Sequence, residues 1–139
     1  MIKIWTMRKA DDMFSLWIRQ RDGMCMHPDC RKKNERDIRY MQNSHFYSRD
    51  EWAVRYDPDN CDTAHIWCHQ GKWEMTKKTD YRTFKIRQLG KKRFKALEKK
   101  VSDSKKMGAY TSHEDRIREC MEFLKEVGFI DNNYRLVKC

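Results

Sequence analysis

The chain has 139 residues, a length typical of one domain. Hydrophobic residues make up 39% and charged residues 37%, so the core is small and a further stabilising element would help. No stretch is apolar over the roughly 20 residues that cross a bilayer, and residues 1–10 lack the apolar run of a signal peptide. We therefore expect no membrane partner and a cytoplasmic location, where six cysteines indicate metal binding rather than disulfides.

The net charge of +10 is confined to one stretch. Residues 72–106 hold 14 basic and 4 acidic residues, a surplus of ten, whereas 17 basic and 17 acidic residues balance elsewhere. Such a concentration is typical of a surface that binds a polyanion. A solvated helical face without a partner fits the composition equally well.

The first predicted element is an amphipathic helix over residues 6–20. Thr6 is a suitable N-cap and Gly23 a suitable left-handed stop. A turn containing Cys25 and Cys30 follows. The apolar residues of the helix recur at i, i+3, i+4 and i+7, at Ala10, Met13, Phe14 and Trp17.

A hairpin is predicted next. Residues 38–47 and 52–56 are rich in aromatic and β-branched side chains, and polar residues 48–51 separate them. Asp-Pro-Asp-Asn at 57–60 is a strong turn signal. A helix capped by Asp62 or Thr63 would follow and end near residue 71.

Residues 80–101 have a helical pattern interrupted at Gly90. Ser112 and Asp115 resemble a capping box, which predicts a last helix that stops at Gly128.

The order of these elements predicts a small α+β fold and a single domain over residues 1–139. Within it we expect an N-terminal helix at 1–24, a metal-binding core at 25–75 and a basic helical extension at 76–139.

Four soft ligands occur as two pairs, Cys25 with Cys30 and His65 with Cys68. The spacing of the second pair lets two side chains bind one tetrahedral ion, and that of the first pair is within the permitted range. We therefore predict a structural zinc site. Cys61 is close enough in sequence to replace His65 as a ligand, and the alternative is that these cysteines are simply buried.

Three polar residues have a second informative spacing, His45-x14-Asn60-x8-His69. On the predicted elements they would lie at a strand end, in a turn and on a helix. Phosphodiester hydrolysis needs a base to activate water, a divalent ion to stabilise charge and a group that orients the base. A neutral imidazole suits the first role because its unperturbed pKa is about 6.5.

This spacing, with flanking zinc ligands, resembles the HNH endonuclease motif. More narrowly, the chain is similar to the NinG (Rap) recombination nucleases of lambdoid phages over residues 8–100. The similarity is carried by Lys9–Asp22, by Ser44-His-Phe-Tyr-Ser-Arg49 with Val54-Arg-Tyr-Asp-Pro-Asp-Asn60, and by His65-x2-Cys68, where that family usually has Cys-x2-Cys.

The resemblance implies a zinc-bound ββα-metal (HNH) core in which His45 is the general base and Asn60 orients it or the loop. His69 would bind a catalytic Mg²⁺ or Mn²⁺ ion. Many HNH enzymes have a metal-binding Asp or His immediately before the base, where this chain has Ser44. The second ligand is therefore left open between three candidates, namely Asn43, His45 itself and Asp37.

The implied substrate is branched DNA, such as Holliday junctions or displacement loops, in the host cytoplasm if a phage encodes the protein. A homodimer is compatible with this substrate, because symmetric cleavage of a four-way junction needs two active sites. Arg49 and Arg55 would bind the scissile phosphate. Further phosphate contacts are expected from the basic cluster Lys91, Lys92, Arg93, Lys95, Lys99 and Lys100.

Two alternatives remain. One is a site-specific or nicking HNH enzyme of restriction or homing type. The other is a zinc-bearing DNA-binding module without catalysis. This hypothesis is motivated by Ser44, which stands where many HNH enzymes have a metal ligand. The sequence assigns no role to Cys120 or Cys139.

Overall fold

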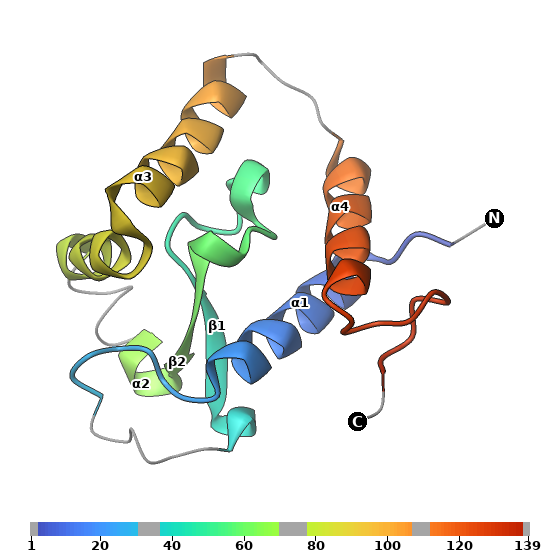
Figure 1. Ribbon diagram of the computed structural model, residues 1–139, viewed down its shortest axis with the longest axis horizontal. Helices are drawn as coiled ribbons and strands as arrows, with labels where there is room; N and C mark the ends of the chain where they lie inside the picture. Colours follow the sequence, from blue (N-terminus) through green and yellow to red (C-terminus); the bar gives the residue numbers. More distant parts are fainter. Residues whose placement is uncertain (1–2, 31–36, 70–77, 107–111, 138–139) are drawn as a thin grey trace.

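The computed structural model describes residues 3–30, 37–69, 78–106 and 112–137. In this part of the chain, four helices and a two-stranded antiparallel sheet confirm the predicted α+β class (Figure 1). The helices are α1 (Met7–Asp22), α2 (Ile66–Cys68), α3 (Lys78–Lys106) and α4 (His113–Glu126), and the strands are β1 (Met41–His45) and β2 (Cys61–His65). Three short 3-10 turns are η1 (Ile38–Tyr40), η2 (Trp52–Val54) and η3 (Pro58–Asn60).

The ends of α1 are set by local hydrogen bonds, as the sequence predicts. The Thr6 hydroxyl accepts from the backbone N–H of Lys9 at 3.1 Å. Gly23 has φ 67°, and its N–H donates to the Arg19 carbonyl at 2.9 Å. One face of the helix is buried through Ala10, Phe14 and Ile18.

The predicted hairpin is wrong in its second strand. β1 pairs with β2, from Met41 opposite His65 to His45 opposite Cys61, and residues 52–54 form the η2 turn instead. The helix expected from residue 62 or 63 is also wrong at its start, because residues 61–65 are a fully buried strand. A strand buried on both sides has no polar–apolar alternation, so its sequence gives no periodic signal.

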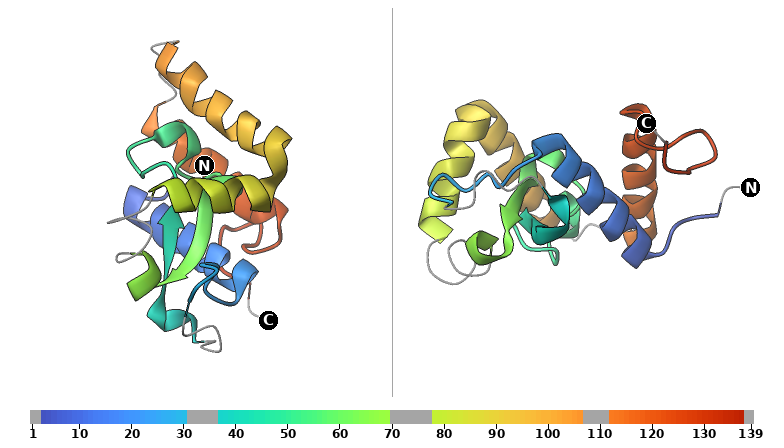
Figure 2. Two further views of the ribbon diagram at one scale, coloured as in Figure 1. Left: turned by 90° about the vertical axis from the view of Figure 1, so that its left-hand side faces the viewer. Right: turned by 90° about the horizontal axis from the view of Figure 1, so that it is seen from below.

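Different elements cover the two faces of this sheet (Figure 2). On the α1 face, the Thr63 hydroxyl donates to the Ile18 carbonyl at 3.1 Å. On the α3 face, the Tyr81 hydroxyl donates to the Ser44 carbonyl at 3.2 Å. The α4 helix packs against α1, away from α3.

The break predicted in the basic helical region is confirmed. Gly90 lies at φ 79° and ψ 161°, which divides α3 into two helical segments. The capping box of Ser112 and Asp115 is formed in α4, and Gly128 follows that helix at φ 76°. Among the described helices, none is both long and apolar enough to cross a membrane.

Candidate active site and metal centre

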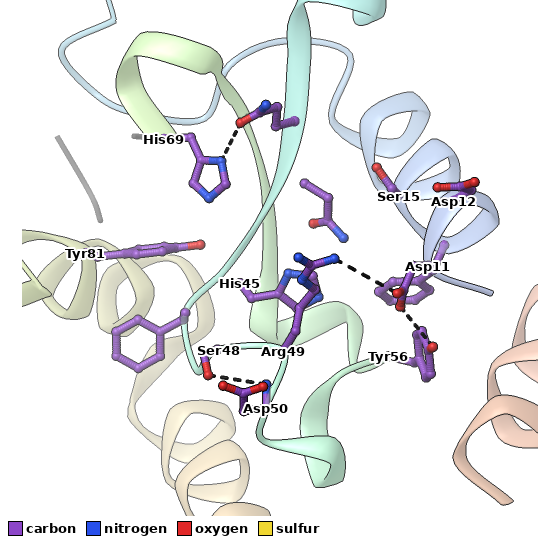
Figure 3. Close-up of a pocket in the computed structure, with 14 residues that line it drawn as sticks. Asp11, Asp12, Ser15, His45, Ser48, Arg49, Asp50, Tyr56, His69 and Tyr81 are labelled. Carbon is purple, nitrogen blue, oxygen red and sulfur yellow. Dashed lines mark hydrogen bonds and ion pairs between the residues drawn. The ribbon is translucent and has the colours of Figure 1, made fainter. Parts of the chain in front are cut away.

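A groove of about 800 Å³ runs past β1. Figure 3 shows His45 at its centre, with His69 and Tyr81 to one side and Asp11 and Tyr56 to the other. Its lining residues come from α1, from β1 and the loop after it, from the end of α2 and from α3: Asp11, Asp12, Phe14, Ser15, Gln42, Asn43, His45, Phe46, Ser48, Arg49, Asp50, Tyr56, His69 and Tyr81.

His45 is the last residue of β1 and is largely buried. Its Nε2 lies 3.1 Å from the carbonyl oxygen of Arg55. Because a carbonyl can only accept, Nε2 carries the hydrogen and Nδ1 holds the basic lone pair. Burial lowers the pKa of His45 to about 4, and the positive charges of Arg49 and Arg55 act in the same direction. The imidazole is therefore neutral at neutral pH.

His69 follows α2 and enters the groove on the side opposite to Asp11 (Figure 3). Its Nδ1 lies 2.7 Å from Oε1 of Gln42, to which it donates. This contact orients the imidazole ring in the groove. The structure thus brings two of the three predicted catalytic residues, His45 and His69, into one groove.

Asn60 does not line the groove but is completely buried below it. Its Oδ1 accepts from the N–H of Tyr47 at 2.8 Å, and its Nδ2 donates to the carbonyls of Tyr47 and Val54 at 3.0 and 3.1 Å. These bonds hold together the loop that supplies the Arg55 carbonyl to His45. Asn60 therefore stabilises this loop, and its expected role of orienting His45 or the loop stays a prediction.

The three candidates for a second metal ligand differ in position. Asn43 lines the groove, and its Oδ1 is buried without a hydrogen-bond partner among the described residues. Asp37 is outside the groove lining and binds Arg39, which lowers the pKa of Asp37 to about 2. His45 lines the groove, as described above. Ser44 is fully buried and absent from the lining, with its carbonyl bonded to Tyr81.

The two arginines expected to bind phosphate have different surroundings. Arg49 is on the groove wall and its side chain is 63% exposed. Arg55 is buried, and its Nε and Nη2 donate to the Asp11 carboxylate at 3.0 and 2.6 Å. Its Nη1 donates to the Arg49 carbonyl at 2.8 Å. The prediction that Arg55 binds DNA is therefore wrong for this geometry, because its guanidinium is used to join the loop to α1.

The predicted basic cluster lies on α3 after Gly90 and all six side chains are exposed. They form two groups. Arg93, Lys99 and Lys100 pair with Asp59, Asp103 and Asp57. Within the described part of the chain, Lys91, Lys92 and Lys95 form no ion pair, so their charges are the most accessible to a polyanion.

Three of the four predicted zinc ligands are together. The thiols of Cys25, Cys30 and Cys68 are buried, and their sulfur atoms lie within 4.8 Å of one another. In a tetrahedral zinc site with Zn–S bonds of about 2.3 Å, sulfurs are roughly 3.8 Å apart. Burial, together with the neighbouring Cys30 and Cys25, raises the pKa of Cys68 to about 12. A cation that stabilises thiolates therefore suits this donor set, and the triad can hold a metal ion such as zinc.

The fourth predicted ligand does not join this triad. His65 is buried, and its Nδ1 accepts from the Trp67 N–H at 3.4 Å as the cap of α2. The backbones of His65 and His27 both hydrogen-bond to Cys25. Two histidines therefore contact the triad through their main chains. The alternative prediction, that Cys61 replaces His65 as a ligand, is wrong, because Cys61 is packed in the core between α1 and α4.

Sequence reasoning missed a buried polar cluster behind the groove. Lys85 and Asp62 are completely buried and pair at 2.9 Å. Tyr81 and Gln88 also donate to Asp62, at 3.2 and 2.7 Å. The sequence pattern that could have predicted this cluster is the position of Lys85. It stands in the apolar stripe of a helix, four residues from both Tyr81 and Leu89.

It also missed Asp11, whose carboxylate accepts from Arg55 and from the Tyr56 hydroxyl. No spacing in the sequence connects α1 with the loop after β1. Comparisons of the chain with protein-family models, curated proteins and solved structures gave no match.

Proposed function

We propose that this protein is a metal-dependent DNA endonuclease of the HNH type that hydrolyses phosphodiester bonds, with branched recombination intermediates as its substrates. The observation that carries the proposal is the groove in which His45, held by a backbone carbonyl, is placed with His69. The order of strand, strand and helical turn agrees with the ββα arrangement that the HNH resemblance implies.

His45 Nδ1 would take a proton from a water molecule as the water oxygen bonds to phosphorus. The bond from phosphorus to the leaving oxygen then breaks, and that oxygen is protonated by solvent. The Arg55 carbonyl keeps the ring oriented and stabilises the imidazolium that forms. The negative charge of a DNA phosphate in the groove would act against the lowering of the His45 pKa by burial.

A catalytic Mg²⁺ or Mn²⁺ ion, bound by His69 with Asn43 as the second protein ligand best placed, would supply charge stabilisation at the phosphate. Arg49 at the groove wall is positioned to bind phosphate oxygens. The exposed Lys91, Lys92 and Lys95 would add affinity that depends on salt but not on sequence.

A structural zinc ion held by Cys25, Cys30 and Cys68 completes the proposal. We retain His65 as its fourth ligand, on the spacing of His65 and Cys68. Zinc there would join the loop after α1 to the turn that carries His69.

A second candidate is a zinc-bearing DNA-binding module without catalysis. It is favoured by Ser44, which is buried and absent from the groove lining at the position where HNH enzymes often have a metal ligand.

The test is cleavage of a labelled four-way junction and of its matched linear duplex, with magnesium or manganese. Wild type should cut the junction, and His45→Ala should lose about 10²- to 10⁴-fold in rate, as expected for a general base. His113→Ala is the control, because His113 is exposed, is outside the groove lining and stacks on Trp52. Binding without cutting would favour the DNA-binding module, and equal cutting of both substrates would favour a restriction or homing type of enzyme.

A further inference from the structure

Two exposed aromatic residues lie two positions before residues that line the groove, Tyr40 before Gln42 and Trp67 before His69. Trp67 is 72% exposed and Tyr40 is 59% exposed. Tryptophan is highly buried on average, so an exposed one that packs on no other ring among the described residues is unusual. The other large exposed hydrophobic residues of the described chain are aliphatic: Met7, Ile66, Val127, Leu136 and Val137.

The sheet register places both aromatics at one end of the fold. Met41 opposite His65 is the last pair of the ladder, so Tyr40 and Trp67 leave the sheet at the same end, on η1 and α2. Both elements lie at the lower end of the sheet in Figure 1 and again in the left view of Figure 2. Each ring is two residues before one member of the Gln42–His69 pair that lines the groove.

The chemistry of these rings identifies their partner. A flat aromatic face beside a cationic group suits nucleobases, which stack on any aromatic ring whatever their sequence. The Arg39 guanidinium lies 6.0 Å from the centre of the Tyr40 ring and supplies a cationic group beside it. In duplex DNA the base faces are covered by their neighbours, so these rings can only use bases that are unpaired.

We infer that Tyr40 and Trp67 form a stacking surface for unpaired nucleobases of a DNA strand that continues from the groove. This inference rests on the proposed function and gives it a substrate feature, namely unpaired bases next to the scissile phosphate. A duplex would use the groove and the lysines of α3 but not this surface.

The experiment measures binding of the zinc-loaded protein to a fluorescein-labelled single-stranded oligonucleotide and to a duplex of equal length, without added magnesium so that no strand is cut. Trp67→Ala and Tyr40→Ala should each weaken single-strand binding by about 5- to 150-fold, which corresponds to the loss of one base–aromatic stack. Duplex affinity should not change. The salt dependence should keep its slope, because no charge is removed.

Two further variants serve as controls. Trp67→Phe keeps a ring and should restore most of the single-strand affinity. Met7→Ala removes an exposed apolar side chain at the start of α1 and should have no effect. Circular dichroism and zinc content should be unchanged in every variant, because the substituted side chains are exposed.

Three results would overturn the inference. They are single-strand affinity that survives Trp67→Ala and Tyr40→Ala, an equal loss for duplex and single strand, and a concentration-dependent dimer that Trp67→Ala abolishes while DNA binding persists. A protein that stacks unpaired bases but cuts no DNA would refute the proposed nuclease and leave the stacking surface standing.

Discussion

On one face of the β1–β2 sheet, α1 and α4 enclose an apolar core, whereas on the other face a cysteine triad and a buried ion pair join α2 and α3 to the strands. The first core contains fully buried apolar side chains such as Phe14, Ile18 and Leu124. The second face has a smaller apolar cluster around Cys25, Cys30 and Cys68, and a separate one packs the part of α3 after Gly90 against the loop after β1, through side chains such as Phe94 and Leu97.

This difference shows how a chain with 37% charged residues can hold two sets of elements together. Burial of apolar surface stabilises one face without directional requirements. The other face adds to its apolar contacts a buried ion pair, whose charges are favourable only when both partners are present. We therefore expect the second face to be the more sensitive one to single changes, and it is the face that carries His69.

The largest effect is expected from Cys68→Ser, which removes one of the three clustered thiols. Structural zinc contributes roughly 10–16 kcal/mol to the folding of zinc-finger peptides, so loss of a ligand should lower the melting temperature sharply and abolish zinc binding. Metal analysis and thermal unfolding measure both results. Cys120→Ser is the matched control, since this buried cysteine belongs to the α1–α4 core and its replacement should leave the zinc content unchanged.

The same assay decides the fourth ligand. His65→Ala should reduce zinc affinity and His27→Ala should not. The reverse result would assign the site to His27, and normal melting and metal content in Cys68→Ser would refute a structural metal at the triad.

An intermediate effect is expected from Lys85→Met. The substitution leaves the Asp62 carboxylate buried without its cation, which typically costs 3–5 kcal/mol. The double variant with Asp62→Leu should regain most of this loss, because it removes both charges. Urea unfolding gives the free energies, and Lys92→Met on the exposed surface should stay within about 0.5 kcal/mol of wild type. Equal destabilisation by the single and double variants would contradict the coupling.

The smallest expected effect is the change of the unfolding free energy with pH that the titration of His45 causes. Its folded pKa of about 4 lies below the unfolded value of about 6.5, so the unfolded state binds the proton more readily. The contribution of the neutral buried ring is complete above pH 6.5 and is lost as the pH falls towards 4. Between pH 7 and pH 5, wild type should lose about 2 kcal/mol of unfolding free energy more than His45→Gln does. Parallel pH profiles for the two proteins would show that His45 titrates alike in both states.

Local interactions are what the sequence by itself determined. The ends of α1, the break at Gly90 and the capping box of α4 depend on residues within one or two helical turns, so their signals are complete in a short window. The pairs Cys25–Cys30 and His65–Cys68 also indicated a shared metal site, because their spacings are those of zinc ligands, and the three cysteines do lie together.

Only the tertiary structure decided that residues 61–65 are a strand, that Arg55 binds Asp11 and that Lys85 is buried against Asp62. Each depends on partners distant in the sequence, such as β1 for the strand, and these partners set the burial and the charge around a side chain. A short polar segment such as Cys61–His65 has no periodic pattern of its own, so its conformation follows from the helices that cover it on both sides.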